Sequence, residues 1–464
     1  MPPATPLESA QPAITEPIGI LGFGVEGAST CRYLLAQGFT DITVFDRKRP
    51  DALPAGVHYA GGDDAPAGYL AGLPAMRTVF RSAGVRPDLP AIAELLAAGG
   101  TLTSQTGLAF ARAGRHRIIG VTGTVGKGTC CSLLEAMLQE AGIPARLGGN
   151  IGVPALDLAD SLAPDEKLIL ELSSFQLSTL AQSPALAAVL RTTSEHLDWH
   201  PDRAEYWLHK SRLVSFQQSA DAVTPGDVLT YCADAEGSAW IAGHSPARKL
   251  PFGAGAEIRL DADAVVWSKR GFRIPLAATR LTGAFNLENI AAAGSLALEL
   301  GAEPRDILAA AMAFNGLEHR LELVRERAGL AFYNDSYATR PEAAIGAIKA
   351  LAGKPTGLIL GGSEKHADFA ELAQTLAAAP HIRAVALIGQ TAARLEAELR
   401  KAGLPHPDGA PALRPCESLE AAVAFLMDSV PQGALVLSPA CASFGMFENY
   451  KERGKAFKRL VAGL

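Results

Sequence analysis

The glycine-rich stretch GVTGTVGKGT, residues 120–129, constrains the fold of this chain more than any other part of the sequence. It follows a short run typical of a buried strand, residues 117–119, and precedes residues 130–141, whose apolar side chains recur at helical spacing. A strand, a glycine-rich turn and a helix are typical of a phosphate-binding loop, to which Lys127 adds a full positive charge. The usual pattern would have a glycine at Val121 and a hydroxyl at Gly128. An ordinary glycine-rich turn between strand and helix is therefore the alternative interpretation.

Length and composition favour a large globular enzyme. A chain of 464 residues has room for about three domains of roughly 150 residues each. Its hydrophobic content of 48% allows large cores, and its formal net charge of -6 argues against general binding to nucleic acid or to a membrane surface. The six cysteines lack the spacing of a zinc site or a disulfide framework, and no signal peptide or membrane-spanning segment is apparent. We expect a cytoplasmic enzyme.

The first part of the chain alternates strands and helices. A predicted strand at residues 18–21 is followed by GFGVEG, a helix as far as residue 37 and a strand at residues 42–45 that ends in Asp46. This is the GxGxxG pattern in its βαβ setting, which alone favours an NAD-dependent dehydrogenase but also occurs where a helix packs closely on a strand. Further strands are expected at residues 78–81 and 101–104, with a helix at residues 89–98 between them.

The same alternation continues twice more. After the glycine-rich loop we expect strands at residues 168–172 and 187–191, helices at residues 203–216 and 286–300, and a small β-rich insertion at residues 227–276. Residues 316–322 suggest a linker. After it, strands are expected at residues 331–333, 357–360, 384–388 and 434–437.

Such alternation predicts parallel sheets, and open parallel sheets bind ligands beyond the carboxyl ends of their strands. Six residues are expected at such ends and are therefore predicted to form one site: Gly120, Glu171, Thr192, Asp335, Gly361 and Ser438.

The motifs, taken in order, resemble the ATP-dependent Mur ligases over nearly the whole chain. They are GFGVEG, VTGTVGKGT, GGNIG, ELSSFQL, EHLDWH, AFNLEN, GLEHRLE, YNDSYAT, GGSEKHADF and SPACASFGMFENYKERG. The resemblance implies an α/β fold of three domains. Residues 1–112 would form a Rossmann-like domain that binds the UDP-substrate, residues 113–316 a central P-loop ATPase domain, and residues 317–464 a Rossmann-like domain that binds the amino acid.

The resemblance also implies a reaction. ATP would convert a carboxylate of UDP-N-acetylmuramoyl-L-alanine into an acyl phosphate, and the amine of D-glutamate would attack it, as in peptidoglycan precursor synthesis. The implied cofactors are ATP and two Mg²⁺ ions. A monomer is expected. Charge around the moving phosphoryl group must be neutralised, and two substrates must be positioned.

Matching positions supply candidates for the nucleotide and the metal. Lys127, His196 and Lys210 are the catalytic candidates, and Lys210 matches a lysine that the family carbamylates, although on the sequence alone it is only a lysine on a helix. The implied metal ligands are Thr129, Glu171, His196 and Lys210. The implied ATP-binding residues are Gly123, Thr124, Val125, Gly126, Lys127, Gly128, Thr129, Asn286, Asn289, Arg320 and Asp335.

Candidates for the two substrates follow in the same way. Those for the UDP-substrate are Gly24, Val25, Glu26, Asp46, Arg47, Gly84, Asn150, Ser173 and Gln176. Those for glutamate are Thr339, Lys365, Ser443, Phe444 and Tyr450.

Four positions depart from the family pattern. Val125 replaces an Asn, Tyr337 a Lys and Phe285 a His, while Gly128 displaces the loop hydroxyl. The loop is similar to that of folylpolyglutamate synthases, where the hydroxyl comes one residue later, as Thr129 does here. The alternatives are therefore the same ligation with L-glutamate, a ligase resembling folylpolyglutamate synthase, and a non-catalytic nucleotide-binding relative.

Overall fold

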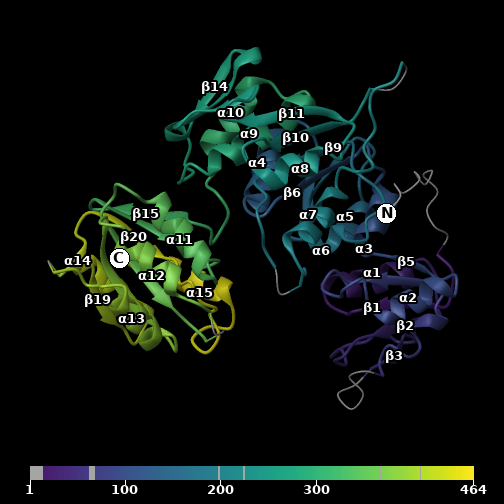
Figure 1. Ribbon diagram of the computed structural model, residues 1–464, viewed down its shortest axis with the longest axis horizontal. Helices are drawn as coiled ribbons and strands as arrows, with labels where there is room; N and C mark the ends of the chain where they lie inside the picture. Colours follow the sequence, from purple (N-terminus) through teal and green to yellow (C-terminus); the bar gives the residue numbers. More distant parts are fainter. Residues whose placement is uncertain (1–13, 62–67, 197–198, 223–224, 365–366, 408) are drawn as a thin grey trace. The chain divides into compact units, whose positions relative to one another are not determined.

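A computed structural model describes residues 14–61, 68–196, 199–222, 225–364, 367–407 and 409–464 (Figure 1). The chain divides into two compact units. The first unit reaches as far as Pro275 and includes Leu287–Ala311, and the second consists of Leu276–Asn286 and Met312–Leu464. The described residues form three separate β-sheets, two in the first unit and one in the second.

The N-terminal sheet is parallel throughout, with strand order β3-β2-β1-β4-β5. Its strands are β1 (Ile18–Leu21), β2 (Ile42–Phe45), β3 (His58–Ala60), β4 (Thr78–Arg81) and β5 (Thr101–Thr103). Its helices are α1 (Val25–Ala36), η1 (Leu73–Ala75), α2 (Pro90–Ala97) and α3 (Gln105–Ala113). The expected strands at residues 18–21, 42–45 and 78–81 are confirmed, and all residues of β1 and β4 are buried because helices cover the sheet.

The central sheet has the order β14-β13-β12-β11-β10-β9-β6-β8-β7. Its strands are β6 (Ile118–Thr122), β7 (Ala145–Gly149), β8 (Lys167–Glu171), β9 (Leu186–Val189), β10 (Val228–Cys232), β11 (Arg248–Gly253), β12 (Ile258–Leu260), β13 (Ala264–Trp267) and β14 (Phe272–Pro275). Its helices are α4 (Lys127–Glu140), α5 (Ala155–Ala159), α6 (Ser174–Leu177), α7 (Arg203–Ser211), α8 (Glu236–Ala242), η2 (Ser268–Arg270), η3 (Leu276–Ala278), α9 (Asn286–Glu299) and α10 (Pro304–Ala313).

Two expectations for this region are wrong. Residues 227–276 are not a separate insertion, because β10 pairs in parallel with both β9 and β11 and so continues the central sheet. Helix α8 makes the crossover that parallel pairing requires. Helix α7 ends at Ser211 and not near residue 216, because the N–H groups of Leu213 and Val214 donate three residues back, to Lys210 O (3.1 Å) and Ser211 O (2.9 Å), in turns that do not continue the α-helix.

The third sheet has the order β15-β16-β20-β17-β18-β19, with β15 antiparallel to β16 and the other pairs parallel. Its strands are β15 (Glu322–Arg327), β16 (Leu330–Asn334), β17 (Thr356–Gly361), β18 (Ile382–Ile388), β19 (Ala412–Pro415) and β20 (Gly433–Leu437). Its helices are α11 (Pro341–Ala350), α12 (Ala370–Ala377), α13 (Ala392–Lys401), α14 (Leu419–Ser429) and α15 (Tyr450–Gly463).

Alternating side chains give the third sheet a core on each face. In β20, Ala434 and Val436 belong to one hydrophobic cluster, and Leu435 and Leu437 belong to another. This period of two explains why β20 is apolar on both of its faces. The first unit differs, since one cluster runs from the N-terminal sheet, with Ile20, into the central sheet, with Leu170.

The prediction of an α/β fold with mainly parallel sheets is confirmed. The exact domain boundaries at residues 112 and 316 stay a prediction. Within the described residues, no helix has the length and apolar character needed to cross a membrane.

Candidate active site

The loop between β6 and α4 has the geometry of an anion-binding turn. Gly123 (φ +154°) and Gly126 (φ +83°) adopt conformations that favour glycine, and Gly126 immediately precedes α4. Among the described residues, no side chain caps this end of α4, and its first turn contains no acidic residue. The first N–H groups of the helix are therefore available to a negatively charged ligand.

Side chains of the loop extend this binding surface. Lys127 Nζ donates to the carbonyl oxygens of Gly123 (3.1 Å) and Thr124 (3.0 Å), so its charge is held over the loop. Thr129 lies half-buried in the first turn of α4, whereas Val125 is exposed. The valine side chain therefore offers the loop no hydrogen bond in place of the expected Asn.

Lys210 lies directly beneath this loop, with 1% of its surface exposed. Its Nζ donates to Gly123 O (2.9 Å) and Thr122 Oγ1 (3.2 Å) and lies 4.7 Å from the ring centre of Tyr206. Burial, reinforced by the nearby charge of Lys127, lowers the pKa of Lys210 well below its ordinary value. The structure thus brings together two lysines that are far apart in sequence.

Glu171 ends β8, next to the loop, because Val121 of β6 pairs with it in parallel register. Its side chain is buried, and Oε1 accepts a hydrogen bond from Asn150 Nδ2 (3.0 Å). Its Oε2 has no hydrogen-bond partner among the described residues. A buried carboxylate oxygen without a partner is costly, and it suits a hard cation such as Mg²⁺.

His196 has a positive φ of 58°, which is uncommon for a residue other than glycine. Its Nε2 lies 3.6 Å from Glu195 Oε2, and its ring centre lies 4.8 Å from that of Phe175. The expectation that Gly120 marks a strand end is wrong, because Gly120 is the middle residue of β6 and Thr122 is the last.

Helix α9 contributes Asn289 to the same loop. A Cβ atom added to Gly126 would lie 2.3 Å from Asn289 Oδ1, so the amide is in close contact with the turn. Asn289 is buried, as a positioned ligand-binding amide would be. Asn286 belongs to the other unit, where its Nδ2 donates to Thr282 O (2.9 Å).

A cavity of about 370 Å³ lies at the carboxyl ends of β1 and β2. Three of the residues expected to bind the UDP-substrate line it: Asp46, Arg47 and Gly84. Asp46 is fixed in place, since Oδ2 accepts from Phe23 N (2.6 Å) and Oδ1 from Lys48 N (3.1 Å).

Two other UDP-substrate candidates join the N-terminal sheet to the central one. Gln176 Nε2 donates to Glu26 Oε1 (2.7 Å), and Glu26 Oε2 accepts from Ala83 N (3.1 Å). Ser173 caps α6 in a reciprocal pair of hydrogen bonds with Gln176. Gly24 and exposed Val25 begin α1, where no side-chain cap is present among the described residues.

In the second unit, Asp335 follows β16 and is almost fully enclosed. Its Oδ2 accepts from Ser438 Oγ (2.6 Å), and its Oδ1 accepts from Leu321 N (3.0 Å). Burial raises the pKa of Asp335 to about 7, although both hydrogen bonds oppose the shift. Arg320 directly precedes Leu321, and its guanidinium lies 4.0 Å from the ring centre of Tyr337.

The glutamate candidates all belong to the second unit. Ser443 is buried, Phe444 is exposed, Thr339 follows a short turn from Tyr337, and Tyr450 begins α15. Lys365 lies outside the described residues. The prediction that the strand-end residues of both units form one site stays a prediction.

The chain matches two family models, described as the Mur ligase middle domain (residues 121–297) and the Mur ligase, glutamate ligase domain (residues 319–441). It is 36% identical over 469 residues to the UDP-N-acetylmuramoylalanine--D-glutamate ligase of Nitrosococcus oceani, covering 98% of each chain. It is 32% identical over 465 residues to the ligase of the same name from Symbiobacterium thermophilum, covering 97% of this chain and 99% of the relative. This chain belongs to the Mur ligase family.

Solved structures confirm that this Mur ligase has the fold of the family. MurC from Thermotoga maritima is 16% identical and superposes with a TM-score of 0.57, covering 96% of this chain and 99% of the other. MurF from the same organism, solved in complex with ADP, is also 16% identical, with a TM-score of 0.58 and coverage of 96% and 94%. The full-length similarity to the two named ligases does not support the dehydrogenase interpretation of GFGVEG.

Sequence reasoning missed three residues that shape these sites in this Mur ligase. Trp199 and Arg86 line the cavity beside Asp46, with the guanidinium 5.0 Å from the Trp199 ring centre. Arg453 is buried and donates to Ser336 O (2.8 Å) and Cys441 O (3.0 Å), which ties two loops together. Trp199 and Arg453 lie in recognised motifs, but nothing in the sequence showed which way they point.

Proposed function

We propose that this Mur ligase joins D-glutamate to UDP-N-acetylmuramoyl-L-alanine, using ATP to form an acyl phosphate, in peptidoglycan precursor synthesis. The observation that carries the proposal is the full-length similarity, at 32% to 36% identity, to ligases named for that reaction. The loop at the start of α4, with Lys127 above it and Lys210 below it, supports the use of a nucleotide phosphate.

The first N–H groups of α4 and the amine of Lys127 would bind the phosphate. These groups point to where negative charge accumulates during phosphoryl transfer, and they are already held in place by the strand and the helix. Asn289 would border the same nucleotide, because its amide touches the loop at Gly126. In the second unit, Asn286, Arg320 and Asp335 are proposed to contact the remainder of ATP.

Mg²⁺ fits the residues beside the loop, since Glu171 presents a buried carboxylate oxygen with no partner among the described residues. Glu171, Thr129 and His196 would hold the ions, which would neutralise phosphate charge when bound. Two ions are proposed.

Lys210 is proposed to be carbamylated. Its buried amine would add to CO₂ and lose a proton, so that an N–H group gives way to a carbamate with two oxygen atoms. The position supports this, because Nζ is enclosed beneath the loop, where it donates to a carbonyl oxygen and a hydroxyl oxygen. Nuclear magnetic resonance of the chain supplied with ¹³C-labelled CO₂ should show a carbamate signal that is absent from Lys210→Ala.

The cavity beside Asp46 and Arg47 is proposed to receive the uridine end of the substrate, since it combines a fixed carboxylate with a cation. The linked pair Glu26 and Gln176, with Ser173 and Asn150, would then lie along the path to the reacting carboxylate. The incoming glutamate is proposed to contact Thr339, Lys365, Ser443, Phe444 and Tyr450. A monomer in the cytoplasm stays a prediction.

The test measures phosphate release from ATP with UDP-N-acetylmuramoyl-L-alanine, Mg²⁺ and each glutamate enantiomer in turn. Release with D-glutamate alone is expected. Release only with L-glutamate would establish the alternative that the departures at Val125, Phe285 and Tyr337 motivate, and release with neither enantiomer would overturn the ligase proposal.

Lys127→Ala tests the nucleotide site directly. Turnover should fall at least about a hundredfold, because one preorganised charge is removed from the transferring phosphate. The circular dichroism spectrum should be unchanged, since the Lys127 side chain donates to carbonyl oxygens of its own loop. Near-normal turnover of this variant would contradict the assignment of the loop.

A further inference from the structure

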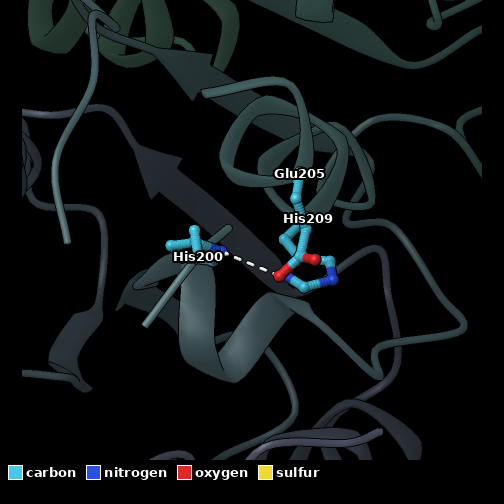
Figure 2. A group of neighbouring side chains, drawn as sticks. All are labelled: His200, Glu205 and His209. Atoms are coloured by element: carbon cyan, nitrogen blue, oxygen red, sulfur yellow. Dashed lines mark ion pairs between the residues drawn. The ribbon is translucent and has the colours of Figure 1, made fainter. Parts of the chain in front are cut away.

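A second cluster of chemically active side chains lies around the start of α7, outside the set assigned to ATP and Mg²⁺. His200 precedes the helix, and Glu205 and His209 are four residues apart on it, so that both project from one helix face. Figure 2 shows the His200 ring directed at the Glu205 carboxylate, with the His209 ring beside it. The three side chains therefore converge from a loop and a helix on one point.

The three side chains lie close enough together to reach a single metal ion. One nitrogen or oxygen of each side chain lies within 4.8 Å of the other two, and His200 Nδ1 is 3.4 Å from Glu205 Oε1 (Figure 2). Two ligand atoms about 2.1 Å from a tetrahedral ion are separated by about 3.4 Å. The His200–Glu205 pair already has that separation.

One buried atom of each side chain lacks a hydrogen-bond partner among the described residues. These atoms are His200 Nδ1, Glu205 Oε1 and His209 Nδ1. His200 is fully enclosed, and its second nitrogen, Nε2, lies 2.9 Å from Ser174 Oγ. When Nε2 carries the proton and donates it to Ser174, the Nδ1 lone pair is left facing Glu205.

Aromatic side chains surround the cluster. Aromatic rings enclose His200, with the ring centres of Trp199 and Tyr206 at 4.6 Å and 5.2 Å.

Arg81, Arg86 and Arg212 already bring positive charge near His209. Arg86 Nη2 lies 3.5 Å from Glu205 Oε1. However, the same guanidinium donates from Nε and Nη2 to the two oxygens of Asp88, each at 2.8 Å. Asp88 thus balances the charge of Arg86, and Glu205 retains a negative charge for a second cation.

We propose that His200, Glu205 and His209 bind one zinc ion in a tetrahedral site whose fourth position is open to water. Two imidazole nitrogens and one carboxylate form a ligand set that suits zinc, whereas Mg²⁺ prefers oxygen ligands alone. The ion would join His200 to the helix that carries Lys210. The site is independent of the proposed ligase reaction, and it can be tested without turnover.

The test is zinc binding by the full, tag-free chain after treatment with a chelator. Competition against a chromophoric chelator should show one tightly bound ion per chain. Glu205→Gln and His209→Gln should each weaken that binding at least about a hundredfold, because loss of a second-shell partner alone costs ten- to a hundredfold. Cobalt(II) added instead should give the absorption of a tetrahedral site with nitrogen and oxygen ligands.

Two control variants separate this site from other zinc-binding positions. His244→Ala removes an exposed histidine from the same unit, and Glu171→Gln alters the proposed Mg²⁺ site; each should retain the zinc. Equal zinc affinity in the unaltered chain and in Glu205→Gln would overturn the proposal. If the variants fail to fold by circular dichroism, the cobalt spectrum of the unaltered chain decides, and an octahedral or absent spectrum would refute the site.

Discussion

Substituting Gly126 by alanine tests the contact between the glycine-rich loop and α9. Gly126 has φ +83°, a left-handed conformation that costs an alanine about 1–2 kcal/mol. The added Cβ would lie 2.3 Å from Asn289 Oδ1, far inside contact distance. Because Asn289 is buried, it has little room to move, and overpacking of this kind typically costs about 1–3 kcal/mol. The free energy of unfolding should therefore fall by about 2–5 kcal/mol.

Gly142→Ala is the matched control, since Gly142 follows the other end of the same helix with φ +69°. Among the residues that the structure describes, no heavy atom lies within 4 Å of its added Cβ. This variant should lose only the backbone contribution of about 1–2 kcal/mol. The difference between the two variants then measures the crowding at Asn289.

The assay is urea unfolding followed by circular dichroism, together with calorimetric titration of ATP. Combining Gly126→Ala with Asn289→Ala should recover most of the crowding term, because the clashing amide is gone. ATP binding should weaken in Gly126→Ala and stay unchanged in Gly142→Ala. Equal losses of stability in the two glycine variants would refute the contact between the loop and α9.

Two further predictions concern buried charges. Arg81→Met should lower the free energy of unfolding by about 2–4 kcal/mol. The reason is that the charged donor to Phe175 O (2.8 Å) and Ser178 Oγ (2.7 Å) is lost inside the first unit. A loss below about 0.5 kcal/mol in urea unfolding would contradict this prediction. Burial raises the pKa of Asp335 from 3.8 to about 7, so the folded chain holds this proton more tightly than the unfolded chain. The stability that the protonated carboxyl contributes is full below about pH 4 and is lost as the pH rises to about 7. Asp335→Asn should make that decline shallower when unfolding is followed from pH 4 to pH 8, and an unchanged slope would show that Asp335 has an ordinary pKa.

Much of the architecture could be predicted from local patterns in the sequence. The runs that became β1, β2 and β4 matched the expected bounds because buried apolar residues such as Ile20, Val44 and Phe80 mark each strand. The glycines at 123 and 126 marked the loop before α4 correctly, since only their backbone freedom permits its conformation. The ordered motifs led to the Mur ligase family, which the full-length relatives confirm.

Other features depended on which strands pair. Residues 227–276 looked like a separate insertion because their pattern is local, whereas the pairing of β10 with β9 that places them in the central sheet is not. The predicted domain ranges likewise did not indicate that the N-terminal sheet and the central sheet share one hydrophobic core.

The sequence by itself determined the strands, the glycine turns and the family, because these depend on neighbours along the chain. Tertiary structure alone decided that Lys210 lies beneath the loop at Gly123, that Glu171 keeps one oxygen without a partner, and that His200 faces Glu205. In each case the decisive quantity is the distance and burial of a side chain relative to residues from another element. Such distances follow from packing, which no spacing along the chain encodes.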